Sequence, residues 1–463
     1  MTPIDRSLRA LLTPIDAAWL AVYRVLFGLA LGISMLRFPL NGWVDALFVE
    51  PTFFFKYWGF EWVEPLSASH MHVLFVGLAL LAFAMAAGLA FRIVAPAFAL
   101  GLTYVQLIDV SNYLNHYYLA ALLAWLLSAS PAARLWSVDA WLARRFLARP
   151  RPDTVARAWL YLFRFQIGLV YVFAGLAKAQ SDWLLHAQPL RIWLGANTDL
   201  PVLGPLLALD WVPLVMSWCG FLFDTTIVGF LLFRRTRPYA YGVVIVFHTL
   251  TRLLFPIGMF PVIMTVSALF FFEPDWPRAL ARRLFGTATR SMPVLPLPAL
   301  PSPGIKLGLL AMAAYCALQL LLPVRFLAYG GNVLWHEQGM RFSWRVMLRA
   351  KGGNTTFVVR NRDSGRVWHV PARQYLTGLQ EAEMSSQPDL ILQLAHHIER
   401  DFAARRLGPV EVRAESSVTL NGRRGVPFLD PNVDLTAERD GLGLARFVLP
   451  APSSPPPHTR PVL

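Results

Sequence analysis

The sequence predicts an all-α polytopic membrane bundle of about nine transmembrane helices, followed by a small extramembrane α+β domain. Of the 463 residues, 56% are hydrophobic and only 15% are charged, whereas an ordinary soluble domain has about 25% charged residues. The apolar residues fall in blocks of about 17–24 residues, long enough to cross a bilayer core about 30 Å thick. After about residue 325 these blocks give way to short strand patterns, which indicate a second domain.

Nine apolar blocks are the predicted spans. The change in composition after the ninth marks the end of the membrane domain. The spans are residues 17–36, 71–91, 93–110, 117–133, 157–177, 211–233, 238–255, 257–273 and 305–323. Pro256 and Gly258 require a tight turn or a re-entrant break between the seventh and eighth spans. We divide the chain into a membrane domain (1–324), an α+β domain (325–449) and a disordered Pro-rich tail (450–463).

The positive charge lies mostly in short loops. The formal charge of +14 would suit a nucleic-acid partner, but the arginines cluster between apolar blocks, as the positive-inside rule requires. They include Arg134, Arg144, Arg145, Arg149, Arg151, Arg234, Arg235, Arg237, Arg278, Arg282 and Arg283. We therefore expect a multi-pass protein of a bacterial inner membrane, in contact with lipid and not with nucleic acid. Its N-terminus would be cytoplasmic and its α+β domain periplasmic.

Two connections on the outer side are too apolar and aromatic to be plain loops. Residues 41–66 and 183–210 contain Trp and Tyr rings of the kind enriched at membrane interfaces. We expect both segments to form interfacial or re-entrant pieces above a site at the outer membrane face.

Ionisable side chains inside the spans are candidate functional residues, because burying them in a membrane is costly. They are Arg24, Asp109, Arg164, Asp224, His248 and Arg252, with Lys178 at the outer end of the fifth span. For Arg24, Arg164 and Asp224 an alternative stays open, in which arginine–aspartate pairs simply hold the bundle together.

The fifth span shows the clearest pattern. Arg164, Tyr171 and Lys178 recur every seven residues along one helix face, and the interleaved glycines, among them Gly175, allow close approach of a helix or a flat ligand. Lysine can lose its proton when desolvated and then act as a general base, which arginine effectively cannot. The alternative is glycine-mediated packing, with Lys178 extending to the interface. His116 begins the fourth span on the same side, as a site residue or a capping residue.

Short strands and one helix are predicted in the α+β domain. The strands are residues 356–360, 367–370, 410–413 and 417–420, with turns at 351–354 and 363–365 and a helix at 388–404. His396-His397 and His336-Glu337 lack the spacing of a zinc site, so we expect no metal.

Seven stretches, in order along the chain, resemble vitamin K-dependent γ-glutamyl carboxylase and its bacterial relatives. They are residues 20–24, 115–119, 136–139, 174–178 followed by 182–183, 255–260, 274–278 and 339–344. The resemblance extends from about residue 16 to 350. It implies an enzyme that couples epoxidation of vitamin K hydroquinone by O2 to carboxylation of a peptide glutamate with CO2.

The resemblance also implies roles for individual residues. Lys178 lies at the position of the catalytic base in this family. His116 and Asn115 lie at a position that the family implicates in epoxidation. We expect the reduced naphthoquinone beside Tyr171, Gly175, Arg164, His248 and Met259. We expect the Glu-containing peptide beside Trp335, Arg341, Trp344, Asp182 and Trp183.

The sequence departs from the animal members of the family at several points. Ala177 replaces a second lysine, Arg345 replaces an acidic residue, and the outer domain is shorter, so propeptide recognition is not implied. Two other classes remain open. One is a quinone-linked membrane oxidoreductase that performs only the epoxidation. The other is a transporter or peptide-maturation protein without enzymatic activity, although the internal repeats common in transporters are not evident. The sequence gives no oligomeric state.

Overall fold

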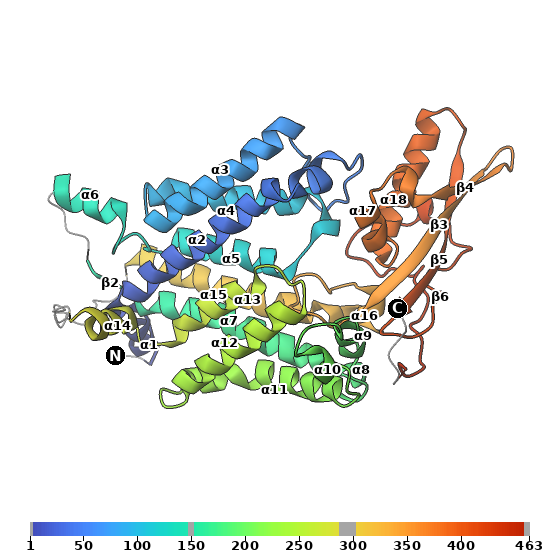
Figure 1. The fold of residues 1–463 in the computed structure, drawn as a ribbon. Coiled ribbons are helices and arrows are strands. Elements are labelled where there is room, and N and C mark those ends of the chain that lie inside the picture. Colours follow the sequence, from blue (N-terminus) through green and yellow to red (C-terminus); the bar gives the residue numbers. More distant parts are fainter. Residues whose placement is uncertain (1–2, 147–151, 287–301, 458–463) are drawn as a thin grey trace.

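The computed structural model describes residues 3–146, 152–286 and 302–457. Figure 1 shows an elongated helical bundle with a small domain of strands and helices at one end. The N-terminus and α6 (Val138–Phe146) lie at the opposite end, together with α14 (Trp276–Phe285) and the short antiparallel pair of β1 (Pro14–Asp16) and β2 (Thr154–Ala156). The arginine-rich connections and the α+β domain are therefore at opposite ends of the bundle.

Six helices in the described residues are long and apolar enough to cross a membrane. They are α2 (Ala18–Leu40), α3 (Ala68–Ala87), α4 (Phe91–Ile108), α7 (Arg157–Lys178), α11 (Val212–Leu232) and α15 (Pro303–Val324), the last extended to Ala328 by a 3-10 turn. This supports a multi-pass membrane protein. The last of them lies mostly exposed on the outside of the bundle, with 11% of its apolar window buried.

The nine predicted spans are not confirmed. The fourth corresponds to α5 (Asn115–Ala129), which has 15 residues, and the eighth to α13 (Phe260–Ser267) with the 3-10 turn up to Phe271. The seventh corresponds to α12 (Arg237–Leu254), which has 18 residues but includes polar ones. Apolar runs in the sequence thus overestimate helix length where the ends of a run form turns instead of helix. As predicted, the helix breaks at Pro256, and Gly258 takes a positive φ of 58°.

Close packing of α2 on α3 depends on small residues. A Cβ atom added to Gly28 would lie 2.8 Å from the carbonyl oxygen of Ala82, closer than a carbon atom can approach. A Cβ atom on Gly32 would lie 2.4 Å from the ring of Phe83. These two glycines therefore set the distance between the first two long helices.

Shorter elements complete the chain. They are α1 (Pro3–Leu12), α8 (Ser181–Leu184), α9 (Leu190–Gly195), α10 (Gly204–Leu207) and α16 (Val333–His336), with a π-helical turn at Asp45–Val49. The segment 183–210 is thus broken into short helical pieces, as expected. The segment 41–66 lies against the outer domain, where the Lys56 N–H donates to Gln393 Oε1 at 2.8 Å.

The outer domain contains one antiparallel sheet in the order β4-β3-β5-β6, with two helices packed beside it. The elements are β3 (Lys351–Asn361), β4 (Val367–Pro371), α17 (Gly378–Met384), α18 (Pro388–Ala404), β5 (Val410–Leu420) and β6 (Val426–Pro427). The predicted helix and the turn at 363–365 are confirmed. The predicted turn at 351–354 is wrong, because this segment pairs with the end of β5, Lys351 opposite Leu420. The two predicted strands at 410–413 and 417–420 form one.

The first part of the Pro-rich tail is placed on the protein surface. Arg423 Nε donates to the Ser454 carbonyl at 2.7 Å, and Gln188 Nε2 donates to the Pro457 carbonyl at 3.2 Å. These contacts differ from the expected disorder. Residues 458–463, most of the Pro-rich stretch 291–304, Arg149 and Arg151 lie outside the described residues.

Arg24 is fully buried, and its partners are backbone carbonyls instead of an aspartate. Its guanidinium donates to the carbonyl oxygens of Ala86, Ala132, Leu135 and Trp136. The side chain therefore supplies hydrogen bonds to carbonyl groups at the end of α3 and in the connection after α5. These carbonyl groups would otherwise lack donors.

We predict that Arg24→Met destabilises the bundle strongly. The substitution leaves several buried carbonyl groups without donors, at about 1–3 kcal/mol for each group. Thermal unfolding of detergent-purified protein should show a large drop in Tm, whereas the control Arg92→Met, at an exposed position, should not change it. Equal Tm values for the two variants would contradict this role of Arg24.

Candidate functional site

Lys178 is the last residue of α7, and its amine pairs with Asp224 on α11. Its Nζ lies 2.7 Å from Asp224 Oδ2 and 5.3 Å from the Trp183 ring centroid. Lys178 is 6% exposed and Asp224 is 7% exposed. The side chain is therefore directed into the protein, and the interpretation in which it extends to the membrane interface is wrong.

Gly175 makes this pairing possible. A Cβ atom at Gly175 would lie 2.6 Å from Thr225 Cγ2 and 2.9 Å from its backbone nitrogen. Because Gly175 has no side chain, α7 and α11 approach closely one turn before Lys178. Gly175 thus acts by helix packing, as one of the two interpretations of the sequence proposed, and not as a residue that lines the cavity.

An apolar cavity of about 90 Å³ lies beside the Lys178–Asp224 pair. We call it the inner cavity, and its apolar lining includes Val170, Met216, Phe247, Phe260 and Met264, with Trp183. On its lining, Tyr171 Oη and His248 Nε2 form a hydrogen bond of 3.0 Å. The Nδ1 atom of His248 is buried and has no partner among the described residues.

The residues of the inner cavity fit a flat apolar ligand with polar edges. The lysine amine and the free nitrogen of His248 are polar groups that hydroxyl groups of such a ligand would satisfy. The volume of about 90 Å³ is below the roughly 300–1,000 Å³ of typical small-molecule sites. A two-ring quinone therefore requires side chains to move.

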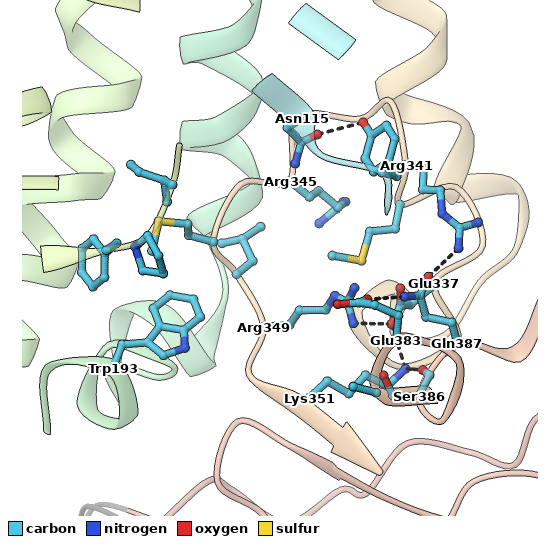
Figure 2. A pocket seen from close by; sticks show the side chains of 18 of the residues that line it. Asn115, Trp193, Glu337, Arg341, Arg345, Arg349, Lys351, Glu383, Ser386 and Gln387 are labelled. Atoms are coloured by element: carbon cyan, nitrogen blue, oxygen red, sulfur yellow. Dashed lines mark hydrogen bonds and ion pairs between the residues drawn. The ribbon is translucent and has the colours of Figure 1, made fainter. Parts of the chain in front are cut away.

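A larger cavity of about 560 Å³ lies between the bundle and the outer domain. In this outer cavity, shown in Figure 2, Arg341, Arg345, Arg349 and Lys351 gather with Glu337 and Glu383. The two cavities share Phe255, Ile257 and Met347 in their linings. Movement of these three side chains would connect the apolar cavity with the charged one.

Most of the charged side chains that line the outer cavity form ion pairs. Glu337 Oε1 lies 2.7 Å from Arg349 Nη1 and 3.0 Å from Lys351 Nζ. Burial lowers the pKa of Lys351 to about 8, and burial raises the pKa of the Glu383 carboxyl group. Arg341 pairs with Asp389 and Gln387 of the outer domain while lining the same cavity.

Asn115 and His116, adjacent in sequence, have different surroundings. Asn115 lines the outer cavity, where its Oδ1 accepts a hydrogen bond of 2.9 Å from Tyr113. His116 is 8% exposed and lies beneath Gly258, where a Cβ atom would be 2.9 Å from His116 Nε2. His116 does not appear among the side chains that line either cavity. The glycine, with its positive φ, leaves room for the imidazole.

Several predicted ligand-binding residues lie away from the cavities. Arg164 Nε donates to the Phe270 carbonyl at 2.7 Å, near the other end of α7, and Met259 precedes α13 without lining either cavity. Trp335 is in the core of the outer domain, with Nε1 donating to the Leu449 carbonyl at 2.8 Å. Trp344 is fully buried in the bundle, stacked at 5.0 Å on Tyr118.

Asp182 holds the outer domain to the bundle. Its two carboxylate oxygens each lie 2.7 Å from a nitrogen of Arg423, and Asn421 Nδ2 donates to Oδ2 at 2.9 Å. Burial acts to raise the pKa of Asp182, but the Arg423 guanidinium and the Asn421 amide outweigh it and hold the pKa below its usual range. The residue that we expected beside the peptide is therefore an interdomain contact.

The structure brings some of the predicted residues together and adds others. Lys178, Trp183, Tyr171 and His248 meet at the inner cavity, and Asn115 and Arg341 meet at the outer one. The sequence indicated Asp224 only as one of several candidate ionisable residues, and it did not assign Glu337, Glu383, Arg345, Arg349 or Lys351 to the site. Asp224 was recognisable as a buried charge and Lys351 as one of four lysines. The charges of Glu337, Glu383 and Arg349 lie in a polar segment, where nothing distinguishes them.

The described residues contain no group of three or more His, Cys, Asp or Glu side chains placed to hold a metal ion.

Fold and cavities together define a multi-pass helical membrane protein with a buried lysine–aspartate pair beneath an outer α+β domain. Residues 12–276 match the HTTM domain, and residues 305–454 match the vitamin K-dependent gamma-carboxylase lumenal domain. No solved structure matches the chain. The two matches cover both structural domains, and the chain belongs to the γ-glutamyl carboxylase family.

We predict that Asp182→Asn loosens the outer domain. Breaking a buried pair by removing one charge costs about 3–5 kcal/mol, because the Arg423 charge stays buried without an anion. The variant should be cleaved faster in limited proteolysis and should unfold at a lower Tm than wild type. Asp363→Asn, at an exposed turn, is the matched control and should behave like wild type.

The pH dependence of this contact follows from the lowered pKa of Asp182. Stabilisation by the carboxylate is complete above the unfolded-state pKa of about 3.9 and is lost as pH falls through the lower folded-state pKa. Wild-type protein should lose this stabilisation below about pH 4, and Asp182→Asn should lack that part of the pH dependence. Identical pH profiles for the two proteins would refute the assignment.

Proposed function

We propose that this protein is a γ-glutamyl carboxylase-like enzyme that couples oxidation of vitamin K hydroquinone by O2 to carboxylation of a peptide glutamate. One observation supports this most directly. The buried Lys178–Asp224 pair lies beside an apolar cavity in the domain that matches the membrane part of this family. The adjoining charged cavity offers a place for an acidic peptide side chain.

Lys178 acts as the base in this proposal, with Asp224 as its proton acceptor. In a buried site desolvation penalises both charges of a lysine–aspartate pair, which favours transfer of the proton from lysine to aspartate. When the proton resides on Asp224, the amine of Lys178 is neutral and can accept a hydroxyl proton from the hydroquinone. The apolar lining and Trp183 exclude water, which would otherwise compete for that proton.

The Tyr171–His248 hydrogen bond positions the opposite edge of the ligand. Tyr171 fixes the imidazole through Nε2, and the buried Nδ1 of His248, which has no partner among the described residues, would bond to a hydroxyl group of the ligand. Bound hydroquinone, with O2, would supply the strong base that removes a γ-proton from glutamate. Asn115, which lines the outer cavity, would contact the reactants from that side.

The outer cavity would receive the peptide from the side of the outer domain. In the orientation that the loop charges indicate, this side is the periplasm. Phe255, Ile257 and Met347 would separate the quinone from solvent until a glutamate side chain enters. CO2 would react in the same water-poor space.

We predict that Lys178→Ala lowers both epoxide formation and carboxylation by at least about 100-fold, the usual contribution of a general base. The assay would use protein in nanodiscs, with vitamin K hydroquinone, O2, labelled bicarbonate and a Glu-containing peptide, and would follow both products together. Lys306→Ala, which removes an exposed lysine of α15, is the matched control and should retain both activities.

Different outcomes separate the candidate functions. Epoxide without fixed label from wild-type protein, across several peptides, would favour the oxidoreductase that performs epoxidation alone. Neither product, with quinone binding demonstrated, would exclude the proposed activity and leave the family membership intact.

A further inference from the structure

Arg345 differs from the other cations of the outer cavity in having no anionic partner. Arg341 pairs with Asp389, while Arg349 and Lys351 pair with Glu337. Among the described residues, no carboxylate lies within ion-pair distance of Arg345, and its buried Nε has no hydrogen-bond partner. A half-buried charge without a counter-ion is costly, so its presence in a cavity indicates a ligand that supplies the missing charge.

The guanidinium is held in a fixed orientation. Its Cζ lies 4.0 Å from the centroid of the Phe326 ring, so the ring supports one face of the group. Figure 2 shows Arg345 reaching into the cavity beneath Asn115. Burial lowers the pKa of Arg345 to about 10, which still leaves the side chain protonated at neutral pH.

Asn115 adds a second donor on the same side of the cavity. Because its Oδ1 already accepts the hydrogen bond from Tyr113, its amide nitrogen remains available, and Figure 2 shows this nitrogen directed toward Arg345. An arginine fork and an amide together match the two oxygens of one carboxylate. Phosphate would meet the nearby carboxylates of Glu337 and Glu383, which disfavour a more highly charged anion.

We propose that Arg345 binds the γ-carboxylate of the substrate glutamate and, with Asn115, sets the preference of this enzyme for a glutamate side chain. The assignment rests on the proposed function for the identity of the peptide, but the binding site itself depends only on the cavity. In this chain Arg345 occupies the position of an acidic residue in animal members of the family.

The positive charge of Arg345 at this place would also assist the carboxylation. When the γ C–H bond breaks, the proton goes to the base generated from hydroquinone and O2, and the electron pair spreads from the γ-carbon into its carboxylate. The side chain then has a second negative charge, which Arg345 would stabilise more strongly than the single charge of the ground state. The electron pair next forms the C–C bond to CO2, which gives a side chain with two carboxylates.

The test compares binding of two neutral-ended peptides that differ in one group. Both are blocked pentapeptides with a fluorescent label, one with a central glutamate and the other with glutamine, so that the γ-carboxylate is the only difference. Anisotropy with protein in nanodiscs, without quinone, would measure the two Kd values. We expect wild-type protein to bind the glutamate peptide about tenfold or more tightly, as a charged hydrogen-bonded contact implies.

Arg345→Gln should abolish this preference and leave the Kd of the glutamine peptide unchanged. Arg345→Lys, which keeps the charge but loses the fork, should retain part of the preference and tests the same point if Arg345→Gln does not fold. The matched control is Arg424→Gln, at an exposed position of the outer domain, which should bind like wild type.

Three results of the binding assay would overturn the proposal. They are absence of any glutamate preference in wild type, an unchanged preference in Arg345→Gln, and equal weakening of both peptides, which would indicate that Arg345 only shapes the cavity. The assay needs no turnover, so selective binding can hold even if the carboxylase assay fails. Conversely, Arg345→Gln turning over the peptide with wild-type KM would refute this inference and leave the proposed function standing.

Discussion

The buried pair of Lys178 and Asp224 is the interaction on which the rest of the membrane domain depends. Two charges in an apolar bundle are tolerated only when each satisfies the other, and here Nζ and Oδ2 are 2.7 Å apart. That distance requires α7 and α11 to be nearly in contact, which the glycine at position 175 permits. A methyl group there would separate the helices and leave two uncompensated charges. Helix packing and site chemistry are therefore set by the same residue.

The sequence predicts the membrane part well where one-dimensional patterns correspond directly to physical requirements. Long apolar blocks must be helices in a bilayer, and a lysine among arginines at the end of a glycine-containing helix indicated the buried base candidate. The helix at 388–404 was equally predictable, because its apolar periodicity is regular. The number of spans was not predictable, since α5 and α13 are shorter than the apolar runs that contain them, and an apolar run does not show where its helix stops.

The outer part of the site could not be predicted, because it depends on contacts between distant segments. Asp182 and Arg423 are far apart in sequence, as are Arg341 and Asp389, and nothing local connects them. Trp344 follows the last span but packs in the bundle core, which no hydropathy pattern indicates. A motif such as 339–344 gives the position of important residues along the chain. It does not separate those that line a cavity, such as Arg341, from those that only fill the core.

The three side chains common to both cavities have a thermodynamic consequence. Phe255, Ile257 and Met347 each line both the inner cavity and the outer cavity. A molecule that displaces one of them on the inner side changes the energy of binding on the outer side. Linkage requires the reverse effect to be equal in size, so occupancy by a peptide would alter quinone affinity by the same factor. If displacement of these side chains by one ligand favours binding of the other, this coupling would suppress oxidant production in the absence of an acceptor, without a separate regulatory domain.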